Sequence, residues 1–372
     1  MALGASTLLA MVSKIRGFIH KRTSSAKELR KTIIIGGICL LVILGTSAIW
    51  TLRQRTEKEK LSRFNDLVSQ ASSRYDEGTA IIGLNRARAR EILIAGQDQV
   101  KIALELFPNE EKAKKLSLDI VAKLRETETQ ASLNFEAVGE FGEPVVALSF
   151  DNKNLTAIVK DKIYEVDPAT RDKNSTKAPD NITSGIVFDG KVFVISPDKI
   201  LRVDLTSEKT TEVGANFNYQ DIAIFFGNVY LLKEDQIAKI TPVENGYAEA
   251  TNYLNDQVDF GSKARMAIDG SVWVSAAKKV YKFTRGVNEN FEISGIVSGL
   301  GELGAVYTSA SLDNLYVIDT TNSALLVVGK DGVYKRAYQA SEFGKASDII
   351  IDDAEEKMYL AVGNQVLEAS LK

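Results

Sequence analysis

A short strand pattern that recurs six times between residue 150 and the C-terminus limits most strongly how this chain can fold. Each copy runs polar, aliphatic, aromatic or threonine, aliphatic, as in Ser271-Val272-Trp273-Val274. A repeat of strand-forming residues at a period of about 40 is typical of β-propeller blades. The copies begin, at spacings of 37, 37, 43, 43 and 43 residues, at Asn154, Lys191, Asn228, Ser271, Asn314 and Lys357.

Turn and strand signals around the copies predict how the ring closes. Residues such as Asp269 and Gly270 precede the strand and supply the backbone angles of a tight hairpin. The last copy, residues 346–372, has room for only three strands, whereas residues 134–141 form a spare strand before the first copy. We therefore expect residues 134–141 to pair with the last blade and close a six-bladed ring, which removes exposed sheet edges.

The N-terminal part of the sequence predicts a membrane anchor. Residues 32–52 contain no charged residue and as a helix would be roughly 31 Å long, which matches the bilayer core. A cleaved signal peptide fits less well, because Thr46-Ser47-Ala48 is a poor cleavage site. Seven basic residues precede the span and five follow it, so residues 1–31 are predicted to be cytoplasmic and the propeller extracytoplasmic.

Residues 53–131 have the pattern of helices. Apolar residues recur about every 3.5 positions, which predicts a helical hairpin or a short coiled coil, with a break at Asp76-Glu77-Gly78. Whether this stalk also oligomerises or is a plain spacer stays open. Arg86, Arg88 and Arg90 are expected to form its solvated face rather than a phosphate site. The predicted domains are a basic tail (1–31), a transmembrane helix (32–52), a helical stalk (53–131) and a six-bladed propeller (132–372).

Composition excludes several kinds of chemistry. A net charge of -3 and an isoelectric point near 5.6 provide no basic field for nucleic acid. The single cysteine, Cys39, and the single histidine, His20, both precede the propeller. Histidine-dependent triads, thiol chemistry and histidine metal sites are therefore excluded from the propeller, and no cofactor is predicted. Carboxylates alone would still be able to hold calcium.

The loops that enter the innermost strands are the predicted binding surface, because loops on a rigid scaffold commonly carry function. Asp221, Arg265 and Asp348 are the predicted ligand-binding residues, and ordinary solvated loop residues are the alternative. No catalytic or metal-ligating residue is predicted. The polar residues of these loops are Glu143, Thr183, Gln220, Asp221, Lys263, Arg265 and Asp348.

Three other motifs are interpreted as structural. Gly299–Gly304 matches G-x-G-x-x-G, but no helix follows it, so an interblade turn is expected rather than a nucleotide site. Asp161, Asp198 and Asp235 are expected to form turns, with a ring of calcium ligands as the alternative. The repeated aromatic residues are expected to pack between blades. They are Phe193, Tyr230, Trp273, Tyr316 and Tyr359.

The repeats, and above all Tyr164–Thr170 and Leu201–Thr206, resemble bacterial six-bladed propellers of the NHL or TolB-like class. The resemblance covers the propeller region and concerns the fold. It implies a binding platform, although some relatives in this class are hydrolases or lactonases.

These observations favour a single-pass membrane protein whose propeller binds a protein or an envelope component without catalysis. Two alternatives stay open. One is a hydrolase that acts through carboxylates or calcium, and the other is a transmembrane sensor that passes ligand occupancy through the stalk to the tail.

Overall fold

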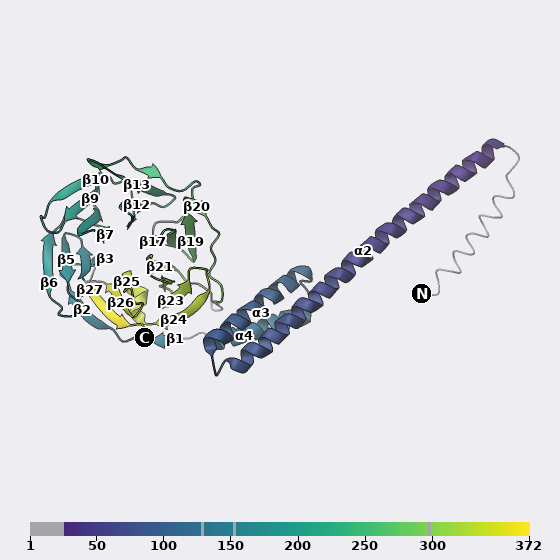
Figure 1. Cartoon of the computed structure of the whole chain (residues 1–372), viewed down its shortest axis with the longest axis horizontal. Coiled ribbons are helices and arrows are strands. Elements are labelled where there is room, and N and C mark those ends of the chain that lie inside the picture. Colours follow the sequence, from purple (N-terminus) through teal and green to yellow (C-terminus); the bar gives the residue numbers. More distant parts are fainter. Residues whose placement is uncertain (1–25, 128–129, 152–153, 297–298) are drawn as a thin grey trace. The chain divides into compact units, whose positions relative to one another are not determined.

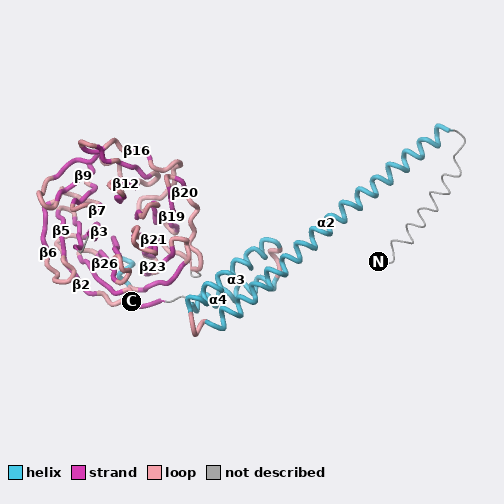
Figure 2. Tube along the Cα trace, in the orientation of Figure 1, coloured by secondary structure: helices cyan, strands magenta, loops and turns pink. Residues whose placement is uncertain are grey.

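The computed structural model describes residues 26–127, 130–151, 154–296 and 299–372, with the backbone alone described for 26–49, 51–53, 130, 131 and 151. The chain divides into two compact units. One contains the described residues up to Asp76 together with Ala95–Leu118, and the other contains Glu77–Ile94 and the described part of Asp119–Lys372. Figure 2 shows that helices make up the first part of the chain and strands the second.

The described residues before the propeller form three helices, α2 (Ala26–Ile81), α3 (Arg86–Leu106) and α4 (Glu111–Thr127). This confirms the helical prediction, but the predicted break at residues 76–78 is wrong because α2 continues to Ile81. A side chain at Gly78 would place its Cβ 2.8 Å from Cγ of Leu93, so this glycine permits close packing within a helix. The turn comes later, and Asn85 caps α3 by accepting a hydrogen bond from Arg88 N at 3.0 Å.

The three helices bury a small apolar core. Phe64, Val68, Ala103 and Ala113 are buried, and the rings of Phe64 and Phe107 meet edge to face at 5.3 Å between centroids. This packing is that of a compact helical bundle, and it does not support the coiled-coil alternative. Leu61, which belongs to the apolar pattern of residues 53–131 and was therefore expected to be buried, is 50% exposed. Oligomerisation through the helices stays a prediction.

Within the described residues no helix has both the length and the apolar character needed to cross a membrane. The predicted span at residues 32–52 falls in α2, but apart from Trp50 its side chains lie outside the described residues. Residues 1–25 of the predicted tail also lie outside them. The structure therefore does not support the transmembrane prediction, which rests on the sequence alone.

Arg90 departs from the prediction of a solvated basic face. Arg86 and Arg88 are exposed, but only 3% of Arg90 is exposed. Its guanidinium donates to Thr127 Oγ1 at 2.8 Å and to the carbonyl of Gly295, and it lies 4.4 Å from the ring centroid of Tyr334. The prediction is wrong for Arg90 because tertiary partners satisfy its charge away from water.

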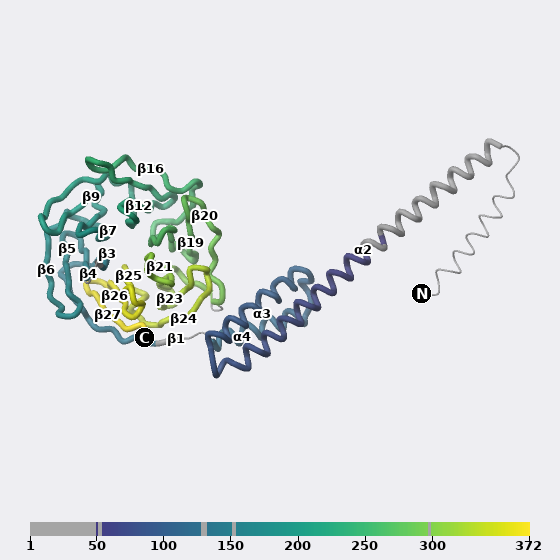
Figure 3. Tube along the Cα trace, in the orientation of Figure 1, coloured from purple at the N-terminus to yellow at the C-terminus, as the bar shows by residue number. Residues whose placement is uncertain are grey.

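The described part of residues 130–372 forms six blades, which follow one another around a ring in sequence order (Figure 3). Blade 1 contains β3 (Val145–Asp151), β4 (Asn154–Val159), β5 (Lys162–Val166) and β6 (Lys173–Lys177). Blade 2 contains β7 (Ser184–Phe188), β8 (Lys191–Ile195), β9 (Lys199–Asp204) and β10 (Thr210–Ala215). Blade 3 contains β11 (Asp221–Phe225), β12 (Asn228–Leu232), β13 (Ile237–Ile240) and β16 (Thr251–Asn252), with a side hairpin of β14 (Pro242–Val243) and β15 (Gly246–Tyr247).

In all six blades the strands of the repeat follow one another in sequence order from the centre of the ring outward, and the other three blades are as follows. Blade 4 contains β17 (Arg265–Ile268), β18 (Val272–Ala276), β19 (Lys279–Thr284) and β20 (Val287–Asn288). Blade 5 contains β21 (Leu303–Tyr307), β22 (Asn314–Asp319), β23 (Ala324–Gly329) and β24 (Tyr334–Gln339), and the short helix η1 (Ser341–Lys345) follows it. Blade 6 contains β25 (Ala346–Ile351), β26 (Lys357–Val362) and β27 (Gln365–Ser370).

The predicted closure of the ring is confirmed. Strand β2 (Glu136–Glu140) pairs antiparallel with β27, with Glu136 opposite Glu368 and Glu140 opposite Gln365 (Figure 1). Strand β1 (Gln130–Ser132) adds a further parallel pairing to β24 of blade 5, which the sequence pattern did not predict. Of the two strands before the first repeat, β2 therefore completes blade 6 and β1 adds a fifth strand to blade 5.

Packing between the blades confirms two further expectations. The repeated aromatic residues are buried, with Trp273 and Tyr316 each 1% exposed. In the Gly299–Gly304 segment, Gly301 N donates a hydrogen bond to Asp319 Oδ2 at 2.8 Å. This bond supports the interpretation of the motif as an interblade turn.

Gly301 offers a direct test of this packing. A Cβ at this position would lie 2.4 Å from Asp319 Oδ1 and 2.5 Å from Thr321 Cβ. Gly301→Ala should lower the free energy of unfolding by about 1–3 kcal/mol, because the buried Asp319 has little room to move. Gly142→Ala is the matched control, since nothing lies within 4 Å of its Cβ position. Urea unfolding measures both variants, and equal losses would contradict the packing explanation.

Candidate functional site

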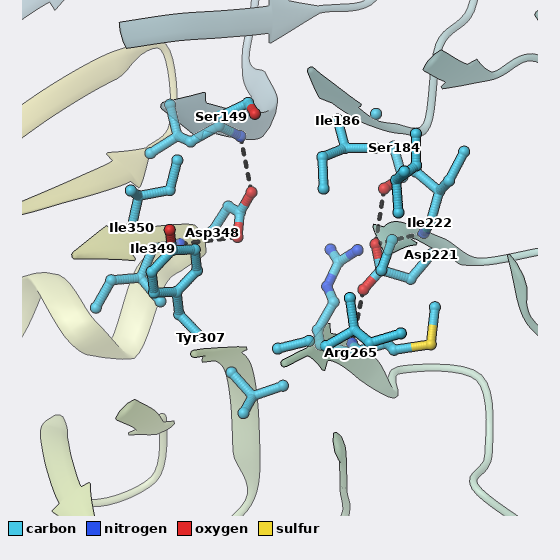
Figure 4. Close-up of a pocket in the computed structure, with 18 of the residues that line it drawn as sticks. Ser149, Ser184, Ile186, Asp221, Ile222, Arg265, Tyr307, Asp348, Ile349 and Ile350 are labelled. Carbon is cyan, nitrogen blue, oxygen red and sulfur yellow. Dashed lines mark hydrogen bonds between the residues drawn. The ribbon is translucent and has the colours of Figure 1, made fainter. Parts of the chain in front are cut away.

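The innermost strands of the six blades surround a central channel. A cavity of about 210 Å³ lies within it and is lined by residues from β3, β7, β11, β17, β21 and β25. Figure 4 shows the polar end of this cavity, where Asp348 and Asp221 stand on opposite sides.

The structure brings the three predicted site residues together. Asp221, Arg265 and Asp348 all line the cavity. Each pairs with the fifth residue of the repeated strand of its own blade, opposite Leu232, Ser275 and Ala361 respectively. Equivalent positions in a propeller lie at the same height around the channel, so the three side chains form one charged tier. Ser184 of blade 2, opposite Ile195, belongs to the same tier.

Both carboxylates of the tier bind the neighbouring blade. Asp348 Oδ2 accepts a hydrogen bond from Leu148 N of blade 1 at 2.7 Å, and its Oδ1 accepts one from Ile349 N at 2.8 Å. Asp221 makes a corresponding set of contacts. Its Oδ2 accepts from Met266 N of blade 4 at 2.8 Å, and its Oδ1 accepts from Ser184 Oγ at 2.7 Å and from Ile222 N at 3.0 Å.

The surroundings of Asp348 hold its carboxyl group near the point of protonation at neutral pH. Burial raises the pKa of Asp348 to about 7, and the negative charge of Asp221 contributes to the rise. The Leu148 N–H and the charge of Arg265 act in the opposite direction. The side chain is half-buried because it borders a narrow channel, yet protein atoms surround it on the remaining sides, so desolvation dominates.

Arg265 supplies the positive charge of the tier. It is the first residue of β17, and its guanidinium points into the channel between Asp221 and Asp348 (Figure 4). Among the described residues it makes no hydrogen bond, ion pair or ring contact within the distances that define them. A half-buried guanidinium with this freedom is suited to bind a carboxylate or phosphate in bidentate fashion.

Tyr307 is a channel residue that the sequence analysis missed. It ends β21 and lines the cavity. Burial, with the negative charges of Asp353, Asp348 and Asp352, raises the pKa of its hydroxyl group, which therefore stays neutral. A comparison of the repeats could have found it. Tyr307 pairs with Tyr316 in blade 5, whereas the equivalent position in blade 6, which pairs with Tyr359, is the apolar Ile350.

Three of the four other predicted loop residues lie at the entrance. Thr183, Gln220 and Lys263 line a second hollow of about 650 Å³, which adjoins the cavity because Arg265 lines both. Glu143 is exposed and does not line either of these two hollows.

The described residues contain no group of three or more histidine, cysteine, aspartate or glutamate side chains placed to hold a metal ion. Asp161, Asp198 and Asp235 instead occupy turns, where their carbonyls accept backbone hydrogen bonds from residues further along the chain. Within the described residues the turn interpretation is therefore favoured over a ring of calcium ligands. The channel tier can exchange a proton near neutral pH and can bind an anion.

Comparisons with known proteins identify the fold. Neither a family model nor a curated protein matches the chain. A gluconolactonase structure from Xanthomonas campestris has a TM-score of 0.50 and 10% identity, covering 64% of this chain and 90% of its own. The regucalcin structure from Agrobacterium tumefaciens has a TM-score of 0.49, with 12% identity over 65% and 95% of the two chains. A streptogramin B lyase structure has a TM-score of 0.47, with 12% identity over 64% and 98%. The protein is thus a six-bladed β-propeller.

The raised pKa of Asp348 predicts a pH dependence of stability. Between the usual value of 3.8 and about 7, the folded protein holds a proton that the unfolded chain releases. Below the pKa of 3.8, the contribution of Asp348 to the free energy of unfolding is therefore fully present. Between 3.8 and about 7 this contribution falls by up to about 1.4 kcal/mol per pH unit, and above about 7 it no longer changes with pH.

Urea unfolding of the wild type and of Asp348→Asn, from about pH 4 to about pH 8, measures this effect. The stability of the wild type relative to that of Asp348→Asn should fall as the pH rises to about 7 and then stay constant, because only the wild type has the titrating group. Parallel stability curves over the whole range would contradict the assignment.

Proposed function

We propose that the central channel is an enzymatic site for a small anionic substrate, at which Asp348 transfers a proton and Arg265 binds the negative charge. The observation that carries this proposal is the single tier of Asp221, Arg265 and Asp348, whose side chains line one cavity in the channel. A carboxyl group with a pKa of about 7 is matched to general acid–base catalysis at neutral pH.

Each residue of the tier has a role that its contacts support. Arg265 would orient the substrate through paired hydrogen bonds to a carboxylate or phosphate. Asp348 retains lone pairs beside the two it uses for Leu148 N and Ile349 N, so it can still accept a proton from a substrate or water. Asp221 would hold the blades in register and raise the proton affinity of Asp348.

The reaction class is proposed as hydrolysis or elimination. Both need a proton acceptor and a group that binds developing negative charge, and both can proceed with the residues of the tier. The similar gluconolactonase structure has the same fold, which makes lactones the first substrates to examine. Because this likeness concerns the fold alone, the tier and not the likeness supports the proposal.

Assays with a panel of lactones and esters, each with and without a carboxylate, test the proposal on the full chain. Asp348→Asn should lower kcat by about a hundredfold or more. Arg265→Gln should raise KM by about tenfold or more for the charged substrates only. Lys209→Gln, at an exposed position of an outer turn, is the control. Turnover that survives Asp348→Asn unchanged would exclude this mechanism.

A binding module without catalysis is the second candidate function. It is favoured by the hydrogen bonds of Asp221 and Asp348, since every carboxylate oxygen already accepts a bond from the protein and the two residues hold adjacent blades together. In that case the partner would be a protein or an envelope component that places an anionic group on Arg265. Binding that depends on Arg265, without turnover of any substrate in the panel, would favour this candidate.

We also propose that residues 32–52 anchor the protein in a membrane, with residues 1–31 cytoplasmic. The support is the run of 21 residues without charge and the excess of basic residues before it. The full chain should stay in the membrane fraction after alkaline extraction. Replacing Leu40 and Leu41 by lysine should release it, because each buried charge costs about 3 kcal/mol in the bilayer. Alanine at both positions is the control, and retention of the lysine variant would refute the anchor.

A further inference from the structure

The channel continues into a groove across the entrance face of the propeller. The hollow at the entrance shares Arg265 with the channel cavity. On its other side it shares Gln220 and Ser262 with an outer hollow of about 590 Å³, lined in part by Phe217, Lys233 and others. We call these three adjoining hollows the entrance groove. A ligand that fills them would be extended, with one end in the channel.

The outer end of the groove is an exposed aromatic platform. Phe217 is 58% exposed, and its ring meets Tyr219 edge to face at 6.3 Å between centroids. Lys233 Nζ lies 5.6 Å from the centroid of Phe217 and 5.2 Å from that of Tyr219. The lysine and tyrosine fix the phenylalanine ring in place while leaving surface for an apolar group of a ligand.

The middle of the groove carries neutral groups that form hydrogen bonds. Gln220 Nε2 donates to the carbonyl of Gly261 at 3.0 Å, whereas its Oε1 has no hydrogen-bond partner in the described residues. A rotation of this side chain would offer the oxygen to an N–H of a ligand, and an unmade bond of a buried group is costly. Thr183 and Ser262 line the same region with hydroxyl groups.

The inner end of the groove carries the positive charge of Arg265. Arg265 points into the cavity, whose volume of about 210 Å³ admits one small terminal group and not a chain. Both aspartates beside it are engaged with backbone N–H groups. Within the tier, the guanidinium of Arg265 therefore has hydrogen-bond donors left for a ligand. It matches a terminal carboxylate in charge and geometry.

We propose that the entrance groove binds an extended peptide end-on, with its C-terminal carboxylate on Arg265 and an upstream side chain on Phe217. This inference rests on the proposed anion-binding role of Arg265, and it takes the bound anion to be the end of a peptide rather than a small free substrate. Charged residues of both signs flank the groove, with Lys233 and Lys263 against Asp235, Asp259 and Glu302. Mixed charge complements a polypeptide, which carries side chains of both signs, better than a neutral glycan.

Fluorescence anisotropy on the full chain tests the inference with two pools of short random peptides, identical except that one ends in a free carboxylate and the other in an amide. The free-acid pool should bind at least about tenfold more tightly, because a charge-assisted bond to Arg265 is lost in the amide. Arg265→Gln should remove this difference. Thermal melting followed by circular dichroism checks that the variant is folded.

Two phenylalanine variants test the path of the chain. Phe217→Ser should weaken binding of the free-acid pool by about two- to tenfold. Phe226→Ser is the matched control, because Phe226 is 81% exposed but does not line the groove hollows. An equal effect of both substitutions would overturn the proposed path.

Small and glycan probes separate the possible failures. If succinate binds through Arg265 but neither peptide pool binds, the peptide inference fails and the anion site of the channel stands. If neither succinate nor peptides bind, both fail. Tighter binding of an oligogalacturonate than of the free-acid peptides would overturn the peptide inference in favour of an acidic glycan.

Discussion

The pairing of β2 with β27 is the constraint on which the propeller depends. Without it, blade 6 would consist of three strands and the ring would have two free ends. The innermost strands surround a channel because the ring is closed, and the charged tier exists because Asp221, Arg265 and Asp348 pair with equivalent residues of the neighbouring strand in their blades. Closure of the sheet edges thus determines both the stability of the fold and the position of the candidate site.

The carboxylates of the tier have a structural task, and in the proposed mechanism they have a chemical one as well. Asp348 joins β25 to β3 across the closure of the ring, and Asp221 joins β11 to β17 on the other side of the channel. These bonds hold the acids in place, while the protein around Asp348 raises its proton affinity. A group fixed by several bonds in a poorly solvated channel is preorganised for chemistry at no further conformational cost. Arg265 has no such bonds and remains available to a ligand.

The repeat allowed most of the propeller to be predicted from sequence. Strand positions, the aromatic interblade core and the closing strand followed from a pattern copied six times. Asp221, Arg265 and Asp348 were predicted only as polar residues of the loops that enter the innermost strands, and the strand register shows that they lie at equivalent positions. Features that occur once were missed. The three-residue strand β1 has no counterpart in the other repeats, and Tyr307 is visible only as a departure from the residue at the equivalent position of the next blade. Arg90 was misjudged, because its helix pattern could not show that Thr127 and Gly295 would surround it.

The sequence pattern also gave a wrong prediction at Gly78, because a glycine can serve either a turn or close packing. Gly78 follows two acidic residues and resembles a helix end, yet it lies inside α2 because Leu93 packs against its backbone. Sequence alone does not separate a glycine needed for a turn from one needed for close contact. The same ambiguity applied to Gly301, where the contact with Asp319 decided the matter.

The pairing of β2 with β27 also sets an order of events during synthesis. Strand β2 leaves the ribosome before any blade, whereas its partner β27 is made after the strands of the other five blades. The early strand must therefore wait, unpaired, while the five complete blades form behind it, and an exposed edge of this kind is open to wrong pairing. Strand β1 pairs with β24, which is made earlier than β27, so this contact can bring β2 beside blade 6 before the chain is finished. On this view the short parallel strand acts as a holding contact, and the propeller closes as a final, separate folding step.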